Sequence, residues 1–138
     1  MNIRTLSKCV IGLVMMLAVT ACRAPASTPA GPTEVQVRLT DFKIELDKST
    51  IPAGKVKFVI LNVSSTTQHE LVIENVGDVD KAMKMGDKTA EASDINPGKS
   101  ATMEWTLDKP GKYLLACHKN LNKVDHFASG MKTEITVQ

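Results

Sequence analysis

Three side chains near the end of the chain have the chemistry of metal ligands. Cys117, His126 and Met131 place a thiol, an imidazole and a thioether in one stretch, just before a final apolar segment, and His69 brings a second imidazole from earlier in the chain. Two imidazoles, a thiolate and a weakly bound thioether are the ligand set of copper sites that transfer single electrons, and soft sulfur suits Cu(I). The residues therefore predict one copper ion that alternates between Cu(II) and Cu(I), with His69, Cys117, His126 and Met131 as its ligands.

A further imidazole stands at His118, directly after Cys117. Neighbouring residues at the end of a strand point their side chains in opposite directions, which separates His118 from an ion bound by Cys117. We therefore expect His126 to be the second imidazole ligand, and His118 to face solvent, support the site or contact a partner. Met83 and Met85 leave open a second hypothesis, an additional Cu(I) site.

The first residues have the pattern of an export signal. Arg4 and Lys8 precede an apolar run, 9–19, that is too short to span a bilayer with ordinary flanks. The run ends in Leu17-Ala18-Val19-Thr20-Ala21-Cys22, which resembles a bacterial lipobox. We expect residues 1–21 to be a lipoprotein signal peptide and Cys22 to be lipidated. The alternative is an ordinary secretory signal cut nearby, with Cys22 incidental.

Export would place the mature protein outside the cytoplasm, on the periplasmic side, with its lipid inserted in a bacterial membrane. There Cys117 has no disulfide partner, because the other two cysteines belong to the signal and the lipid anchor.

Residues 22–33 are the lipidated Cys and a tether rich in Pro and Ala, and residues 34–138 form one domain. The formal charge of +2 comes from Arg4 and Lys8, so the mature part is neutral and nothing indicates a nucleic-acid partner. We expect a monomer.

Short apolar segments separated by turn residues predict an all-β sandwich. Apolar residues alternate over 35–39 and again, in the opposite phase, over 42–46. A shift by one residue turns every side chain to the other face, so both sets face the core only if a bulge or bend lies near Thr40-Asp41. The polar stretch from 75 to 96 is less regular, and we expect a helical turn around 80–85.

The alternation of side chains along strands also orients three of the proposed ligands. Residues two or four apart on a strand share a face. Each of these ligands shares its parity with apolar residues of the same segment, so all three point inward: His69 with Leu71 and Ile73, Cys117 with Tyr113 and Leu115, and Met131 with Ile135 and Val137.

Most of residues 34–138 resemble the cupredoxins, the plastocyanin/azurin group of small type 1 blue-copper proteins. The specific motifs are Gly-x-Tyr-x3-Cys at 111–117 and His-x3-Gly-Met at 126–131; weaker ones lie at 54–62, 68–73, 97–101, 107–113 and 135–137. The resemblance implies a Greek-key β-sandwich of seven to eight strands. It also implies that His69 comes from a loop–strand junction and the other ligands from the loop between the last two strands. A backbone N–H near Glu70 would donate to the thiolate, electrons would leave through the exposed edge of His126, and Phe127 would help to form an apolar docking patch.

The spacing between Cys117 and His126 is longer than in most small cupredoxins and resembles that of copper nitrite reductases. Those enzymes use a His directly before the Cys, where this chain has Ala116, and multicopper oxidases use a His on both sides. A binuclear centre needs a second Cys. We therefore expect a carrier of single electrons between redox proteins such as cytochromes or oxidases, not an enzyme. The alternative is a copper-handling protein for tolerance, delivery or sensing.

Overall fold

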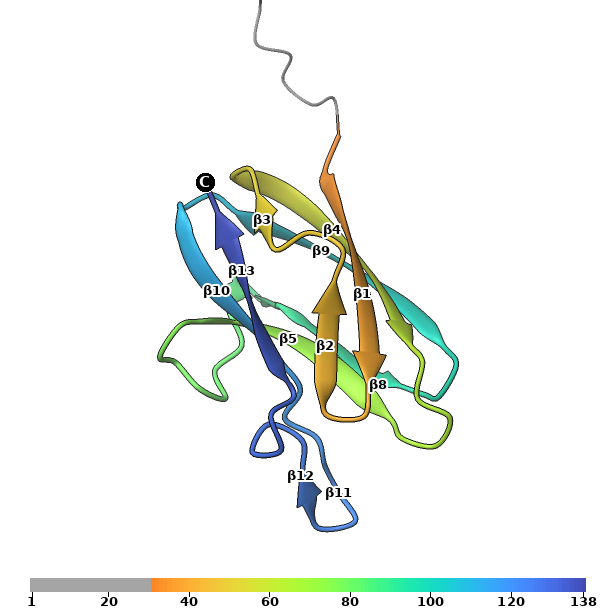
Figure 1. The fold of residues 1–138 in the computed structure, drawn as a ribbon. Coiled ribbons are helices and arrows are strands. Elements are labelled where there is room, and N and C mark those ends of the chain that lie inside the picture. The colour runs from red at the N-terminus through yellow and green to blue at the C-terminus, as the bar shows by residue number, and fades with distance from the viewer. Residues whose placement is uncertain (1–30) are drawn as a thin grey trace, which may run out of the picture.

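The computed structural model describes residues 31–138, which fold into strands arranged as two sheets packed face to face (Figure 1). The expected signal peptide and the lipidation of Cys22 lie outside these residues and stay predictions. Within the described part of the chain, no helix is long and apolar enough to cross a membrane.

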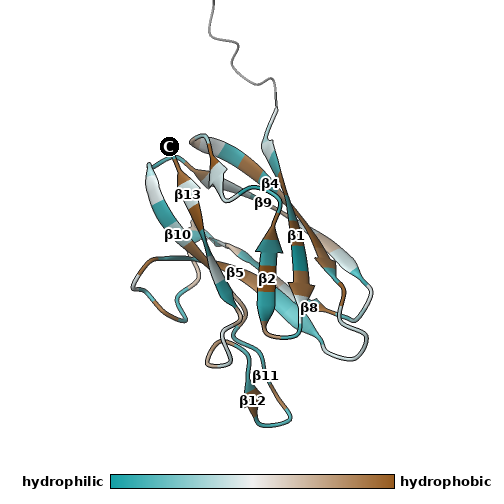
Figure 2. Cartoon of the chain, viewed as in Figure 1, coloured by the Kyte–Doolittle hydropathy of each residue, from teal (hydrophilic) through white to brown (hydrophobic). Residues whose placement is uncertain are grey.

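The first sheet has the order β2-β1-β4-β9. Its strands are β1 (Thr33–Thr40), β2 (Lys43–Leu46), β4 (Gly54–Asn62) and β9 (Ser100–Leu107). β1 runs parallel to β4, and the other neighbours are antiparallel. Buried apolar residues alternate with exposed polar ones along β1, and Figure 2 shows the matching alternation of hydropathy. This alternation is what a sheet with one face on the core requires.

The second sheet has the order β3-β13-β10-β5-β8 and carries the expected ligands. Its strands are β3 (Thr50–Ile51), β5 (His69–Asn75), β8 (Glu91–Ile95), β10 (Gly111–Ala116) and β13 (Lys132–Val137). The central strand β10 is antiparallel to both β5 and β13. Two small hairpins complete the chain: β6 (Lys84–Met85) with β7 (Lys88–Thr89), and β11 (Asn120–Leu121) with β12 (Val124–Asp125).

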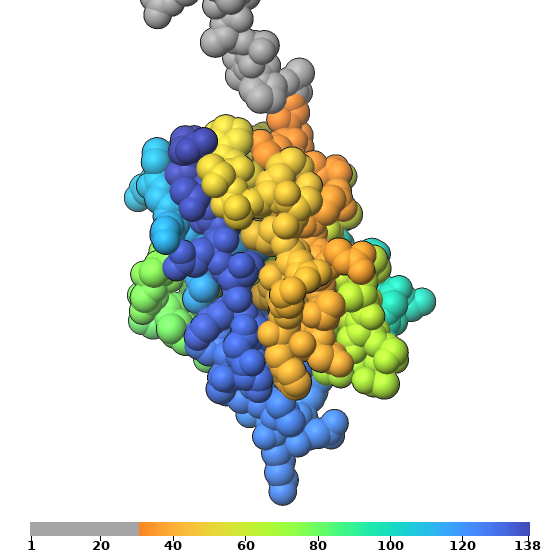
Figure 3. Space-filling view, viewed as in Figure 1, coloured from red at the N-terminus to blue at the C-terminus, as the bar shows by residue number. Residues whose placement is uncertain are grey.

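The core lies between the two sheets and receives buried apolar side chains from both. The largest fully buried ones include Leu39, Phe58, Ile60, Leu71, Ile73, Leu107, Leu115 and Ile135. In the space-filling view, β13 and the β1–β2 hairpin lie side by side and close one face of the sandwich (Figure 3). The predicted all-β sandwich is confirmed. The two sheets together contain nine strands among residues 31–138, more than the seven or eight expected, because the two-residue β3 joins the second sheet.

Two local expectations are wrong. The change of phase after residue 39 is not a bulge or bend within a strand but a hairpin turn between β1 and β2. Phe42, at that turn, has a φ of 62° and is 40% exposed, so it does not join the core. The expected helical turn at 80–85 is absent, and β6 pairs with β7 instead. Gly86, with a φ of 61°, supplies the left-handed residue that this tight turn needs.

Candidate metal centre

Three of the four predicted ligands meet at one end of the sandwich. The Nδ1 atoms of His69 and His126 are 3.3 Å apart, and the Sγ atom of Cys117 is 3.4 Å from Nδ1 of His126. One ligand atom from each of the three residues lies within 4.8 Å of the others. All three side chains are buried, His126 being 1% exposed. The structure thus brings together residues that are up to 57 positions apart in the chain.

The pairing of β5, β10 and β13 explains this arrangement. His69 is the first residue of β5, Cys117 follows the last residue of β10, and Met131 precedes the first residue of β13. These strands are neighbours in one sheet, so the three ends lie together. His126 comes from the loop after β12. Cys117 and Met131 belong to the buried core cluster, which agrees with the inward orientation predicted from parity. His69 is fully buried, but so are its neighbours on both faces of β5.

Backbone hydrogen bonds close the loop that carries the last three predicted ligands. The N–H of Cys117 donates to the carbonyl oxygen of Met131 at 3.1 Å, and the N–H of Met131 donates to the carbonyl oxygen of His126 at 2.9 Å. Gly130 has a φ of 100°, a conformation that glycine adopts readily. Met131 is fully buried at this point. Its role as the weak axial ligand stays a prediction.

The surroundings favour the neutral form of both imidazoles. Burial is the main cause that lowers the pKa of His69, and the neighbouring His126 adds to it. Burial also lowers the pKa of His126. A neutral imidazole offers a nitrogen lone pair, which is the form that binds metals. The pair is therefore prepared for coordination at neutral pH.

Burial raises the pKa of the Cys117 thiol, while the backbone N–H groups of Lys119 and Glu70 act in the opposite direction. The N–H of Glu70 is the donor expected from the sequence, and that of Lys119 was not foreseen. A coordinating thiol is deprotonated by the metal, and hydrogen bonds to the sulfur then stabilise the thiolate.

The donor set and its spacing fit a copper ion. A thiolate and a thioether suit Cu(I), and imidazole suits copper as well. Nitrogen ligands about 2.0–2.1 Å from a metal, at tetrahedral to trigonal angles, are about 3.3–3.6 Å apart. The separation of the two Nδ1 atoms, 3.3 Å, falls in this range. His69 and His126 would therefore bind through Nδ1, and Cys117 through its sulfur.

His118 lies in a separate cluster. Its Nε2 atom is 2.8 Å from Oε1 of Glu74, a fully buried carboxylate, and its backbone N–H donates to Oε1 of Glu70 at 2.8 Å. Its ring stacks on Phe127, with centroids 4.6 Å apart, and the Nζ atom of Lys132 is 4.1 Å from the centre of the Phe127 ring. The structure thus places His126, and not His118, beside His69 and Cys117. Phe127 is partly exposed and contacts both the His118 ring and the Lys132 ammonium group. Its expected part in a docking patch stays a prediction.

The expectation that the edge of His126 is exposed is wrong. The Phe42 ring packs against the imidazole of His126 edge to face, with centroids 5.5 Å apart, and His126 is almost fully buried. The carboxylate of Asp41, in the same turn, is 3.5 Å from Nε2 of His69. Hydrogen bonding to Ser64 is the main cause that lowers the pKa of Asp41. Alternation assigns Phe42 to the core and leaves Asp41 at a bend, so the sequence does not predict that either turn residue lies beside the site.

Replacing each of the two candidate histidines with alanine should affect different properties of the protein, the copper spectra in one variant and the stability in the other. We expect His126→Ala to abolish the thiolate-to-copper absorption of the copper-loaded protein and to alter the Cu(II) EPR spectrum. His118→Ala should keep both spectra but lower the free energy of unfolding by about 1–3 kcal/mol, because the buried Glu74 loses its imidazole partner. Visible and EPR spectra and urea unfolding of the two variants check this. Loss of the absorption in His118→Ala but not in His126→Ala would reverse the assignment.

Comparisons with known proteins agree with this fold. A family model described as a cupredoxin-like domain matches residues 10–137. Reduced auracyanin from Roseiflexus castenholzii is 24% identical, with a TM-score of 0.59, and the match covers 78% of this chain and 99% of that one. Auracyanin A, a blue copper protein from Chloroflexus aurantiacus, is 18% identical with a TM-score of 0.57, over 78% of this chain and 100% of that one. The nitrite reductase from Thermus scotoductus SA-01 is 16% identical with a TM-score of 0.52, over 78% of this chain and 31% of the enzyme. At sequence identities of 16–24% these solved structures show a common fold only.

A search of curated protein sequences found no match.

Proposed function

Because this chain belongs to the cupredoxin-like family, we propose that it carries single electrons on one copper ion bound by His69, Cys117, His126 and Met131. Copper is the cofactor that the family and the donor set identify. The observation that carries the proposal is the group of two imidazole nitrogens and one sulfur, all buried and within 4.8 Å of one another. When bound, copper supplies a one-electron couple between Cu(II) and Cu(I).

The residues around the site support this function by holding the ligands in place. Backbone hydrogen bonds join Cys117 to Met131 and Met131 to His126, so the ligand loop is fixed before a metal binds. Burial excludes water from the imidazoles and the sulfur. A rigid, dry site changes little between the two oxidation states, which favours fast electron transfer. The N–H groups of Glu70 and Lys119 at the sulfur would help to set the reduction potential.

Electron transfer is favoured over catalysis by what surrounds the site. Among residues 31–138, the group of His69, Cys117 and His126 is the one cluster of three or more His, Cys, Asp or Glu residues arranged to hold a metal. Ala116 stands directly before Cys117, where nitrite reductases need a second metal ligand. Met83 packs against the core and Met85 is 51% exposed. An additional Cu(I) site at these residues stays a hypothesis, and a stoichiometry of one copper per chain would reject it.

Location and partners are further parts of the proposal. The resemblance of 17–22 to a lipobox supports a protein anchored to a bacterial membrane outside the cytoplasm. Its partners there would be redox proteins such as cytochromes or oxidases. The second candidate function, copper delivery, tolerance or sensing, uses the same ligands but requires the ion to leave. Burial of the site favours retention of the ion over its release.

A copper titration followed by redox cycling tests the proposal. The full chain, purified in detergent, is titrated with Cu(II) while visible absorption and EPR are recorded. We expect one copper per chain, an intense thiolate-to-copper band that disappears on reduction and returns on oxidation, and little loss of metal over many cycles. Absence of the band would reject the site. Rapid loss of copper to a Cu(I) chelator during cycling would favour copper handling.

A further inference from the structure

The turn between β1 and β2 covers the candidate metal centre. Asp41 and Phe42 occupy its tip, and each contacts one of the two predicted histidine ligands. Phe42 packs on His126, and Asp41 approaches Nε2 of His69, the ring nitrogen other than the one that faces His126. The turn is far from the ligands in sequence, and nothing in the ligand motifs includes it.

His69 needs a partner at its outer nitrogen. Its Nδ1 atom faces His126, which leaves Nε2 on the other side of the ring. Nε2 is buried and makes no hydrogen bond of good geometry within residues 31–138. The Oδ1 atom of Asp41, at 3.5 Å, is the acidic group placed to accept its proton in a hydrogen bond. A small shortening of this distance would complete a carboxylate–histidine–metal arrangement, the common support of a metal-binding imidazole.

We propose that Asp41 is a positioning residue of the copper site, which accepts a hydrogen bond from Nε2 of His69 and stabilises Cu(II) relative to Cu(I). This inference rests on the proposed copper-binding function. The carboxylate orients the imidazole so that Nδ1 faces the metal, and it makes the ring a better electron donor. Its negative charge also interacts more favourably with the doubly charged ion than with the singly charged one.

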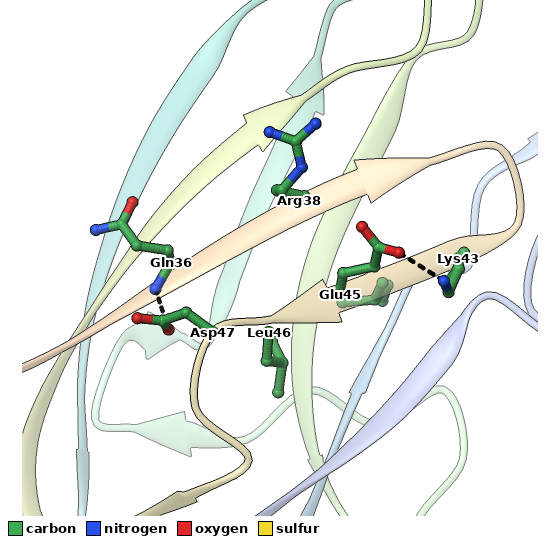
Figure 4. A pocket seen from close by; sticks show the side chains of 7 residues that line it. Gln36, Arg38, Lys43, Glu45, Leu46 and Asp47 are labelled. Carbon is green, nitrogen blue, oxygen red and sulfur yellow. Dashed lines mark hydrogen bonds and ion pairs between the residues drawn. The ribbon is translucent and has the colours of Figure 1, made fainter.

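Hydrogen bonds and an ion pair stabilise the β1–β2 hairpin and so hold its tip in place. The backbone N–H of Gln36 donates to Oδ1 of Asp47 at 2.7 Å, and Lys43 pairs with Glu45 at 2.5 Å, as Figure 4 shows on the outer face of the hairpin. These groups line a surface hollow that lies outside the predicted ligand group. At the other side of β1, the N–H of Val63 donates to the carbonyl oxygen of Leu39 at 2.9 Å. The turn is therefore attached to the segment that leads into β5 and His69.

Asp41→Asn tests the proposal, because it removes the charge and keeps the shape. The side chain of Asp41 is 53% exposed, so the variant should fold. We expect the affinity for Cu(II) relative to Cu(I) to fall about tenfold, at the lower end of the range for such supporting residues because Asp41 is half exposed. That change raises the reduction potential by about 59 mV for a one-electron couple. Asp41→Glu, which restores the charge, should recover part of the shift.

Glu45→Gln is the matched control. It removes the same charge from the same hairpin, but Glu45 pairs with Lys43 on the outer face and not with a histidine. We expect its potential and its Cu(II) affinity to stay near those of the unmodified protein. Equal potentials for Asp41→Asn and Glu45→Gln would overturn the role of Asp41 while leaving the copper-carrying function in place.

A measurement on the metal-free protein separates the two proposals further. ¹⁵N NMR should show His69 protonated at Nε2 in the unmodified protein and a mixture of the two tautomers in Asp41→Asn. A mixed population in both proteins would also overturn the role of Asp41, whatever the copper spectra show. If the unmodified protein binds no copper with a thiolate band, the proposed function itself fails, and the role of Asp41 fails with it.

Discussion

Replacing Cys117 with serine is expected to abolish the intense visible absorption of the copper-loaded protein and its ability to retain Cu(I). The sulfur is the soft donor of the group, and a hydroxyl oxygen cannot replace it in binding Cu(I). Cys117 is the one cysteine within residues 31–138, so no other thiol there can take its place. We expect Cu(I) affinity to fall by more than the 10–100-fold typical for loss of a supporting residue, since here a ligand itself is lost. Competition with a Cu(I) chelator, together with visible and EPR spectra, measures both effects.

Cys22→Ser provides the control for the same chemical change. It removes a sulfur that lies outside the predicted ligand set, so the spectrum and the Cu(I) affinity should be unchanged. The same variant tests the expected anchor, because the protein should then leave the membrane fraction. A copper protein that keeps its visible band after Cys117→Ser would not have the proposed site.

The second large effect concerns the sandwich that carries the site. Phe58→Ala should lower the free energy of unfolding of the metal-free protein by about 3–5 kcal/mol, the usual cost of removing a large buried aromatic side chain. Phe58 is fully buried on β4, between its partners Val35 on β1 and Met103 on β9. The truncation leaves a cavity at the centre of the first sheet. Urea unfolding measures the loss, and the metal-free form is used because a bound ion adds its own stabilisation.

Lys57→Ala is the matched control on the same strand. Its side chain points to the other face and makes one exposed ion pair, with Glu34 at 3.5 Å. Such a pair contributes about 0–1 kcal/mol, so unfolding should change little. The ligands come from the second sheet and its loops, and we expect the folded fraction of Phe58→Ala to keep its copper spectrum. A loss of stability in Phe58→Ala no larger than in Lys57→Ala would contradict the packing of this core.

Several sheet strands could be predicted from alternation because one face of each is buried. β8 (Glu91–Ile95) could not, because it lies in the polar stretch from 75 to 96. Along β1 and β9, inward apolar and outward polar residues repeat with a period of two, and this pattern alone indicates a half-buried strand. The pattern is weaker where a strand has only two residues. For this reason the sequence predicts neither β3 nor the strands of the β6–β7 and β11–β12 hairpins, and the polar segment around 80–85 resembles a helical turn instead.

The types of metal ligand at the candidate site could also be predicted from the sequence. Residues 34–138 contain one cysteine and three histidines, few enough that residue type and spacing restrict the possible metals. The direction of three ligands followed from parity, which depends only on local strand geometry. Assigning Phe42 to the core, in contrast, failed because the phase change arises from a reversal of the chain and not from an irregular strand.

The sequence by itself determined the donor types, the all-β class and the inward faces of the ligand strands, because these depend on residue chemistry and on a local period. Only the tertiary structure decided which residues surround the site. It buried His126 under Phe42, brought Asp41 to His69 and paired His118 with Glu74. The residues in these contacts are 28 to 84 positions apart in the sequence. The contacts depend on the order of the strands and on the register of the β1–β2 hairpin. Both are established by strand pairing across the whole sandwich, which a local pattern does not encode.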